Sequence, residues 1–316
     1  MRIFRHYAEL PDAIKGGVVA LGNFDGIHLG HQRVIGIALD AAKARGVACG
    51  VMSFEPHPRS VFQPDLPPFT LTPFRIRARL IESLGVDFLL LQHFDLAFAA
   101  HTADQFVDQV LVEGLGVAEV VVGYDYHFGR GRKGNVDTLK EMAGRNGFTV
   151  TSISPVTTVD GMVYSSSHIR DALEEGRPRD AASLLGRYWE IEGRVEHGDR
   201  RGRTIGFPTA NIQLDDYLRP ATGVYAVRAG IDKGAATEWL PGVANLGHRP
   251  TFDKADPLLE VHLFDFAGDI YGRHLRVALV DYLRPERKFA GPDALKAQIE
   301  LDCQAARLSL AGANAP

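Results

Sequence analysis

The segment Val18-Val-Ala-Leu-Gly-Asn-Phe-Asp-Gly-Ile-His-Leu-Gly-His31 decides the fold of the first half of this chain. Its four apolar residues, Val18 to Leu21, predict a short buried strand. Small and apolar residues at helical spacing from Val34 to Ala41 then predict a helix that ends at Gly46. A strand that passes directly into a helix is typical of a parallel sheet with crossover helices.

Two histidines, His28 and His31, flank the N-terminus of that predicted helix. Free backbone N–H groups and the positive end of the helix dipole favour an anion there, and the imidazoles add hydrogen-bond donors. Gly30 has no Cβ, so a nucleotide can approach the backbone closely. The spacing resembles the H-x-G-H signature of nucleotidyltransferases that attack the α-phosphate of ATP and expel pyrophosphate. The alternatives are two surface histidines at a helix cap and half of a zinc site, for which Cys49 and Cys303 are poorly spaced.

Composition narrows the class of protein. A chain of 316 residues exceeds the usual size of one domain, which favours two. Its 35 basic and 39 acidic residues give a net charge of −4, which argues against a nucleic-acid surface. The N-terminus lacks an apolar signal core, no apolar run is long enough to span a bilayer, and two unpaired cysteines fit a reducing compartment. We expect a cytoplasmic protein whose partners are small-molecule substrates, without nucleic-acid or membrane partners; its homo-oligomeric state stays open.

Apolar runs alternate with helical patterns through about residue 155, which predicts a parallel sheet whose ligands bind at the carboxyl ends of its strands. The predicted strands are Val18–Leu21, Val47–Phe54, Phe88–Gln92, Glu119–Gly123 and Thr149–Ile153.

From Tyr188 onward the pattern changes to short alternating runs separated by glycine and proline, which predicts an antiparallel barrel or sandwich. A last helix is predicted to begin at Pro292. Its inner side is expected to carry Leu295, Ile299, Cys303 and Ala306. The change of pattern places the domain boundary near Leu184 to Arg187, with domains at residues 1–186 and 187–316.

A basic loop, Gly129-Arg-Gly-Arg-Lys-Gly134, matches G-x-G-x-x-G. The preceding strand ends near Gly123, too early for the tight turn of a dinucleotide site, so a basic loop beside a phosphate site is the better interpretation. Asp125 offers an acceptor for a hydroxyl or ring N–H, and Phe128 offers an aromatic surface for stacking. An ordinary strand-to-loop junction is the alternative.

The run Tyr164-Ser-Ser-Ser-His-Ile-Arg170 leads into another predicted helix. Ser166, Ser167 and Arg170 form a second set of donors for a triphosphate, in which a guanidinium stabilises charge on departing pyrophosphate. A simple serine cap of the helix is the other interpretation, and both can hold at once.

The second half offers a different kind of phosphate site. No G-x-x-x-x-G-K-[ST] loop occurs in the chain, so a kinase here binds phosphates by other means. Thr209 and Asn211 in Gly206-Phe-Pro-Thr-Ala-Asn211 supply hard oxygen ligands suited to Mg²⁺ carrying a nucleotide. Glu260 points away from the apolar face of its predicted strand. It is either a solvated carboxylate or a base that accepts a proton from an attacking hydroxyl.

Nearly the full chain resembles the bacterial bifunctional riboflavin kinase/FMN adenylyltransferases, also called FAD synthetases. The resemblance rests on seven motifs in the family's order: G-N-F-D-G-I-H-L-G-H, S-F-E-P-H-P, S-S-S-H-I-R, G-F-P-T-A-N, G-V-A-N-L-G-H-R-P-T-F, L-E-V-H-L-F-D and L-R-P-E-R-K-F. It implies a Rossmann-like α/β nucleotidyltransferase domain that adenylylates FMN, followed by an antiparallel β-barrel with a terminal helix that phosphorylates riboflavin. ATP and Mg²⁺ are the implied cofactors, and riboflavin, FMN and FAD are substrates and products.

The resemblance also implies roles for individual residues. In adenylyl transfer, His28, His31 and Arg170 act on the transition state, while Asn23, Gly30, Ser166, Ser167 and Asp125 bind ATP. In the kinase, Glu260 is the base, Thr209 and Asn211 hold metal and phosphates, and Arg203 and Gly206 bind ATP. The implied flavin contacts are Phe62, Phe128, Asn245 and Arg249.

One pair of residues, Tyr126-His127, departs from the Phe-Arg common in the family, which puts a contact from that loop in doubt. Two competing functions are considered. The first is a riboflavin kinase with a degenerate first domain, which the presence of His28, His31 and Arg170 opposes. The second is a flavin-binding carrier or regulator without ATP turnover.

Overall fold

The computed structural model describes residues 1–196, 206–233, 236–248 and 257–312. The chain divides into two compact units, which are described separately. The first contains residues 1–67 and 72–165, and the second contains residues 68–71 and 166–316. Apart from residues 68–71, the first unit ends at Ser165 and the second begins at Ser166. This boundary lies about twenty residues before the change of sequence pattern.

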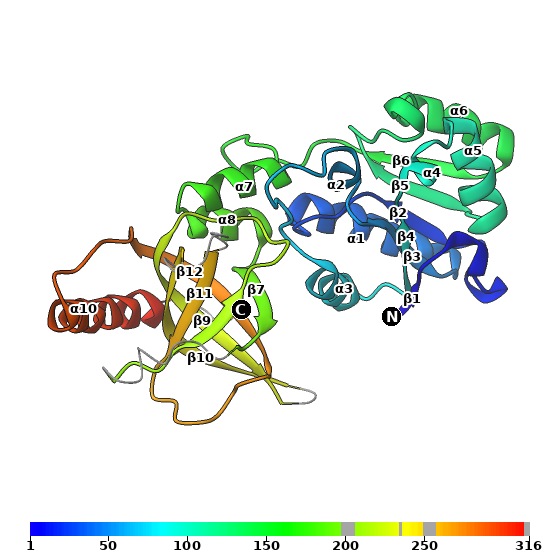
Figure 1. The fold of residues 1–316 in the computed structure, drawn as a ribbon. Helices are drawn as coiled ribbons and strands as arrows, with labels where there is room; N and C mark the ends of the chain where they lie inside the picture. The colour runs from blue at the N-terminus through cyan, green and yellow to red at the C-terminus, as the bar shows by residue number, and fades with distance from the viewer. Residues whose placement is uncertain (197–205, 234–235, 249–256, 313–316) are drawn as a thin grey trace. The chain divides into compact units, whose positions relative to one another are not determined.

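The first unit is built on a six-stranded parallel sheet in the order β1-β4-β3-β2-β5-β6 (Figure 1). This confirms the α/β prediction. Its strands are β1 (Arg2–Phe4), β2 (Val18–Leu21), β3 (Cys49–Glu55), β4 (Phe88–His93), β5 (Glu119–Gly123) and β6 (Thr149–Ile153). The order reverses direction at β2, whose neighbours are β3 and β5, and such a switch point opens a crevice at the carboxyl ends of the strands.

Alternation along the central strand separates two apolar cores. Val18 and Ala20 pack in the core that includes Ile35 and Ala38 of α1 (Leu29–Arg45), whereas Val19 and Leu21 face the other core. The remaining helical segments of this unit are η1 (Tyr7–Glu9), η2 (Asp12–Ile14), α2 (Pro58–Phe62), α3 (Phe74–Ser83), α4 (Leu96–Ala99), α5 (Ala103–Gln105), η3 (Phe106–Gly114), η4 (Arg130–Arg132) and α6 (Val136–Asn146).

The second unit is a six-stranded antiparallel sheet in the order β7-β12-β9-β10-β11-β8. The strands are β7 (Trp189–Arg194), β8 (Ala210–Gln213), β9 (Gly223–Asp232), β10 (Thr237–His248), β11 (Pro257–Leu263) and β12 (His274–Arg284). An isolated bridge between Glu196 and Asn211 joins the chain after β7 to β8, so the sheet is a nearly closed barrel. This resolves the choice between barrel and sandwich that the strand pattern left open.

Side chains alternate along each strand between the interior and the outer face of the barrel. Cross-strand partners such as Leu259 and Ile212 are fully buried and form its interior. On the outer face, α10 (Pro292–Ala311) covers Val224 and Val243 of the sheet (Figure 1). The predicted start at Pro292 is confirmed; Ala306 is fully buried, whereas Leu295, Ile299 and Cys303 are half-buried. The helices α7 (Ser166–Glu174) and α8 (Pro178–Leu185) complete the unit.

Residues 68–71 belong to the second unit because their carbonyl groups accept hydrogen bonds from it. The Trp189 indole Nε1–H donates to the Leu71 carbonyl oxygen at 2.8 Å, and the Leu218 backbone N–H donates to the Thr70 carbonyl oxygen at 2.9 Å. Trp189 is fully buried, so Leu71 satisfies a donor that would otherwise lie in the apolar interior.

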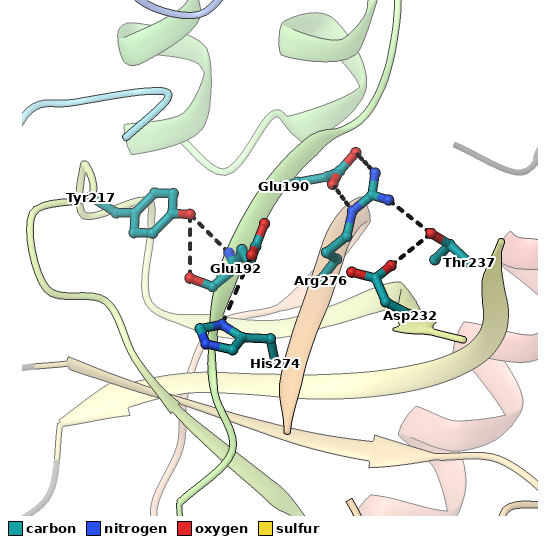
Figure 2. A network of polar contacts seen from close by, with 7 residues as sticks. All are labelled: Glu190, Glu192, Tyr217, Asp232, Thr237, His274 and Arg276. Carbon is teal, nitrogen blue, oxygen red and sulfur yellow. Dashed lines mark hydrogen bonds and ion pairs between the residues drawn. The ribbon is translucent and has the colours of Figure 1, made fainter. Parts of the chain in front are cut away.

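A polar network lies on the outer face of β7 and β12 (Figure 2). The Arg276 guanidinium donates to both carboxylate oxygens of Glu190, at 2.9 and 3.2 Å, and to the Thr237 hydroxyl at 3.1 Å. It also stacks on the Trp239 ring, 4.8 Å from the ring centroid. Both members of the ion pair are largely buried, so the network ties the three strands β7, β10 and β12 together.

Candidate active sites

His28 and His31 stand at the carboxyl end of β2, where α1 begins. His28 is the N-cap of α1, and its Nδ1 accepts the backbone N–H of His31 at 3.2 Å. The two imidazole rings are stacked with centroids 3.6 Å apart, and His28 is only 6% exposed. Because Nδ1 of His28 is an acceptor, its Nε2 carries the ring proton and acts as the donor. The capping interpretation and the anion-site interpretation therefore describe the same arrangement.

Gly30 leaves space for the His28 ring. A Cβ at Gly30 would lie 3.0 Å from Nδ1 and 3.1 Å from Cε1 of His28, closer than real Cβ atoms normally approach. The missing side chain thus makes room for the imidazole, and the close approach of a nucleotide to this backbone stays a prediction.

The loop before the histidines is held by Thr72. The backbone N–H of Thr72 donates to Oδ1 of Asp25 at 2.9 Å, and its hydroxyl oxygen accepts the Gly26 backbone N–H at 2.8 Å. Asp25 and Thr72 are buried. These bonds fix the turn that precedes His28. The sequence analysis did not identify them, because Thr72 lies more than 40 residues away along the chain.

A second set of contacts holds the backbone of Asn23. Its carbonyl oxygen accepts the Ser53 hydroxyl at 2.9 Å and a guanidinium N–H of Arg77 at 3.4 Å. Arg77, only 2% exposed, also forms an ion pair with Glu55 at the end of β3. The side chain of Asn23 is exposed, and its contact with phosphate stays a prediction.

The three other expected contacts of this unit lie in different environments. Asp125 is exposed just beyond β5. Phe62 is 59% exposed at the end of α2, with its ring edge-to-face on Phe94. Phe128 is 6% exposed and packs against Phe106, in the core. Phe62 therefore offers the larger surface for a flavin ring, and the flavin contacts of both residues stay predictions.

Ser166, Ser167 and Arg170 lie on α7, in the second unit. Nε of Arg170 donates to the Phe69 carbonyl oxygen at 2.8 Å, and its guanidinium lies over the Phe69 ring at 5.4 Å. These contacts restrict the guanidinium to one orientation. That this cluster and the two histidines act on one triphosphate remains a prediction.

In the barrel, Asn211, Glu260 and Asn245 form a row across three adjacent strands. Asn211 of β8 is the direct partner of Glu260 of β11, which is in turn the direct partner of Asn245 of β10. Direct partners in an antiparallel pair place their side chains on the same face with Cβ atoms about 5 Å apart. Here that face is the outer face of the barrel.

Asn211 has the chemistry of a metal ligand. It is 3% exposed, and among the described residues its Oδ1 has no hydrogen-bond partner. A buried amide oxygen without a donor is costly unless a ligand satisfies it, and Mg²⁺ prefers such hard oxygens together with substrate phosphates and water. No group of three or more His, Cys, Asp or Glu side chains in the described part of the chain could hold a metal ion.

Glu286 joins this row from the segment after β12, and the sequence analysis missed it. Nδ2 of Asn245 donates to Oε1 of Glu286 at 3.3 Å. A Cβ at Gly247 would overlap the Glu286 carboxylate, so glycine is needed for this approach. Arg284 donates to both oxygens of the buried Asp302 on α10, which anchors the segment.

Thr209 is half-buried immediately before β8, and Gly206 is exposed with a positive φ of 94°. Between them, the Pro208 carbonyl oxygen accepts a hydrogen bond from Nδ1 of His262 at 2.9 Å. The remaining expected kinase residues, Arg203 and Arg249, lie outside the described residues.

None of the helices in the described ranges combines the length and apolar character needed to cross a membrane. Two family models match the chain in succession: FAD synthetase over residues 10–168 and riboflavin kinase over residues 185–310.

Curated relatives match almost the whole chain. The bifunctional riboflavin kinase/FMN adenylyltransferase of Escherichia coli K12 is 42% identical over 308 residues, which cover 97% of each chain. The protein of the same name from Bacillus subtilis is 43% identical over 295 residues, covering 92% of this chain and 91% of the relative.

Among solved structures, a Streptococcus pneumoniae protein described as a macrolide-efflux protein has 33% identity and a TM-score of 0.85, covering 96% of this chain and 98% of its own. The similarity extends through both units in order, and the histidine pair of the first and the Asn211–Glu260 row of the second lie within the two matched families' ranges. The chain therefore belongs to the family of bifunctional riboflavin kinase/FMN adenylyltransferases.

Proposed function

We propose that this protein makes FAD from riboflavin in two steps, phosphorylating riboflavin to FMN in the barrel and adenylylating FMN at the His28/His31 site. The observation that carries the proposal is the row of Asn211, Glu260 and Asn245, in which a buried amide oxygen without a donor lies beside a carboxylate. Membership of the family supports both steps.

In the kinase step, Glu260 accepts the proton of the terminal ribityl hydroxyl as that oxygen attacks the γ-phosphorus of ATP. The new O–P bond forms as the bond to the β-phosphate oxygen breaks, and ADP leaves. Thr209 and Asn211 orient the phosphates and hold Mg²⁺, which neutralises phosphate charge when it is bound. Arg203 and Gly206 bind ATP, and Asn245 and Arg249 contact the flavin.

In the adenylyl step, a phosphate oxygen of FMN attacks the α-phosphorus of ATP, and the bond to the departing pyrophosphate breaks. Nε2–H of His28 donates to the phosphate oxygens on which charge accumulates, and His31 acts with it. No covalent enzyme intermediate is needed, so positioning and electrostatics supply the acceleration.

Binding of the two substrates of this step is divided among the other residues. Asn23, Ser166, Ser167 and Arg170 bind the triphosphate, and Asp125 binds the nucleotide. Phe62 and Phe128 lie beside the flavin. We further propose a cytoplasmic location, with small molecules as the substrates. Cys49 is buried, Cys303 is half-buried and neither forms a disulfide, which fits a reducing compartment.

The test is an assay of the purified protein with riboflavin, ATP and Mg²⁺, followed by chromatography. We expect FMN first and then FAD, with ADP and pyrophosphate as co-products. FMN without FAD would identify a kinase with a degenerate first domain. Bound flavin without ATP turnover would identify a carrier.

A further inference from the structure

His262 lies on the same face of β11 as Glu260, two residues along the strand. It is the histidine of the L-E-V-H motif, and the proposed reaction leaves it without a role. Successive same-face residues of a strand are about 7 Å apart, so its ring stands next to the proposed base. The ladder between β11 and β8 ends where Val261 pairs with Ala210.

Beyond the end of this ladder, the His262 side chain holds the segment that leads into β8. Pro208 has no backbone N–H and cannot continue the hydrogen-bond pattern as a donor. Its carbonyl oxygen instead accepts the hydrogen bond from Nδ1 of His262 at 2.9 Å. Because the next residue is Thr209, this bond attaches the proposed metal- and phosphate-binding segment to the strand that carries Glu260.

Aromatic contacts hold the His262 ring in place for this bond. Phe207 lies edge-to-face with the ring at a centroid distance of 5.3 Å, and Phe264 does so at 6.0 Å. A carbonyl oxygen can only accept, so Nδ1 of His262 must carry a proton, and the neutral ring is the Nδ1–H tautomer.

We propose that His262 is a positioning residue for phosphoryl transfer: its Nδ1–H bond to Pro208 sets the distance of Thr209 from Glu260. The inference rests on the proposed roles of Thr209, Asn211 and Glu260 in the kinase. Asn211 is already held by its ladder pairing with Glu260, whereas Thr209 lies outside the ladder. An error of about 1 Å between reacting groups can reduce a rate about 100-fold, so one bond at this place has a measurable effect.

The first test is the tautomer of His262 in the full-length protein without substrates. Long-range nitrogen–proton NMR on histidine labelled with ¹⁵N reports which ring nitrogen carries the proton, and the signal missing from His262→Asn assigns it. At about pH 8 we expect the Nδ1–H form, because the Pro208 carbonyl oxygen can only accept a hydrogen bond. The Nε2–H form would overturn the proposal.

The second test compares two variants in the kinase assay. His262→Phe keeps an aromatic ring but removes the donor, whereas His262→Asn keeps an amide N–H close to the position of Nδ1. We expect kcat for FMN formation to fall about 10-fold or more in His262→Phe, with a smaller change in the KM for riboflavin. His262→Asn should stay within about 3-fold of wild type, and both variants should adenylylate added FMN normally. Equal losses in the two variants, or none in His262→Phe, would refute the positioning role.

Glu260→Gln, assayed in parallel, separates this inference from the proposed function. Turnover retained in Glu260→Gln would overturn the proposed kinase site itself, and the positioning role with it. Loss in Glu260→Gln with wild-type turnover in His262→Phe would leave the site intact and reject His262 alone.

Discussion

Asn211 and Glu260 are direct cross-strand partners on the outer face of the barrel, although they lie almost 50 residues apart in the chain. One is a buried amide oxygen with no donor in the described part of the chain, and the other is a half-buried carboxylate. The pairing places the proposed ligand for a hard cation next to the proposed proton acceptor, a combination suited to phosphoryl transfer to a hydroxyl.

Glu260→Gln should reduce riboflavin phosphorylation by about 100-fold or more, because a general base contributes about that factor. The amide keeps the shape of the side chain, so binding of ATP and riboflavin should be nearly unchanged. Steady-state kinetics and titration calorimetry measure the two properties. Glu238→Gln, on the exposed part of β10, is the matched control and should behave as wild type. Undiminished turnover in Glu260→Gln would mean that another group accepts the proton.

Replacing both His28 and His31 with Ala should abolish FAD formation and leave FMN formation near wild type, so that FMN accumulates. The imidazoles are proposed to interact more strongly with the transition state than with bound ATP, so turnover should fall more than ATP affinity. Chromatography of the products, with circular dichroism as a check on folding, tests this. Conversion of FMN to FAD at the wild-type rate would show that the two histidines only cap the helix.

Two glycines of the same helix provide a finer test of the histidine site. Gly30→Ala would place a Cβ against the His28 ring, whereas a Cβ at Gly36 would point into open space. Gly30→Ala should therefore lower FAD formation selectively, while Gly36→Ala should leave it unchanged and raise helix stability by up to about 1 kcal/mol. Equal activity in the two variants would show that the His28 ring need not keep its position.

A fragment that begins at Leu185 should fold and make FMN but not FAD, with lower stability than the full chain. It lacks Leu71, so the buried Trp189 Nε1–H loses its acceptor, at a cost of about 1–3 kcal/mol. It also lacks α7 and most of α8, and a fragment from Ser166 should be more stable for that reason. Urea unfolding followed by tryptophan fluorescence compares them. Insoluble or inactive fragments from an active parent would argue that the barrel depends on the first half of the chain.

Removing one partner of the Glu190–Arg276 pair should destabilise the barrel strongly. Glu190→Ala leaves a largely buried guanidinium without its carboxylate, which typically costs about 3 kcal/mol or more. Glu190→Leu combined with Arg276→Met should recover most of this loss, since no buried charge remains. The exposed pair Lys233–Glu238 is the control, because Glu238→Ala should change stability by less than about 1 kcal/mol. A loss in Glu190→Ala no larger than in the control would contradict this account of the network (Figure 2).

The two cysteines should react slowly while the protein is folded. Burial, with a smaller effect of Asp87, raises the pKa of Cys49 from 9.0 to about 12, and burial raises the pKa of Cys303 to about 11. The thiolate is the reactive form, so labelling near pH 8, followed by mass spectrometry, should modify Cys303 before the more buried Cys49.

The same shifts predict the effect of alkaline pH on stability. Above about pH 9 the unfolded thiols lose protons that the folded protein retains, so the free energy of unfolding should fall as pH rises through this range. Cys49→Ala and Cys303→Ala should each reduce this dependence in chemical unfolding. Stability that rises between pH 9 and 11 would contradict the sign of the shifts.

Local chemistry in the sequence determined much of the first unit. The apolar run Val18–Leu21, the helix N-terminus beside His28 and the stop at Gly46 were all predicted, because strand burial, helix starts and left-handed glycine depend on neighbouring residues. Pro292 marked the start of the last helix for the same reason. The edge strand Arg2–Phe4 was missed, since three residues are too few to show a strand pattern and none of them is buried.

Tertiary structure alone decided which distant residues meet. The pairing of Asn211 with Glu260, the hold of Thr72 on Asp25, and the attachment of Leu71 to Trp189 all join segments more than 40 residues apart. No local pattern encodes such partners, because strand register and buried hydrogen bonds are chosen by the packing of the whole unit. The residue types proposed to perform the chemistry can be identified along the chain, while the contacts that orient them form only when the barrel closes and the parallel sheet assembles.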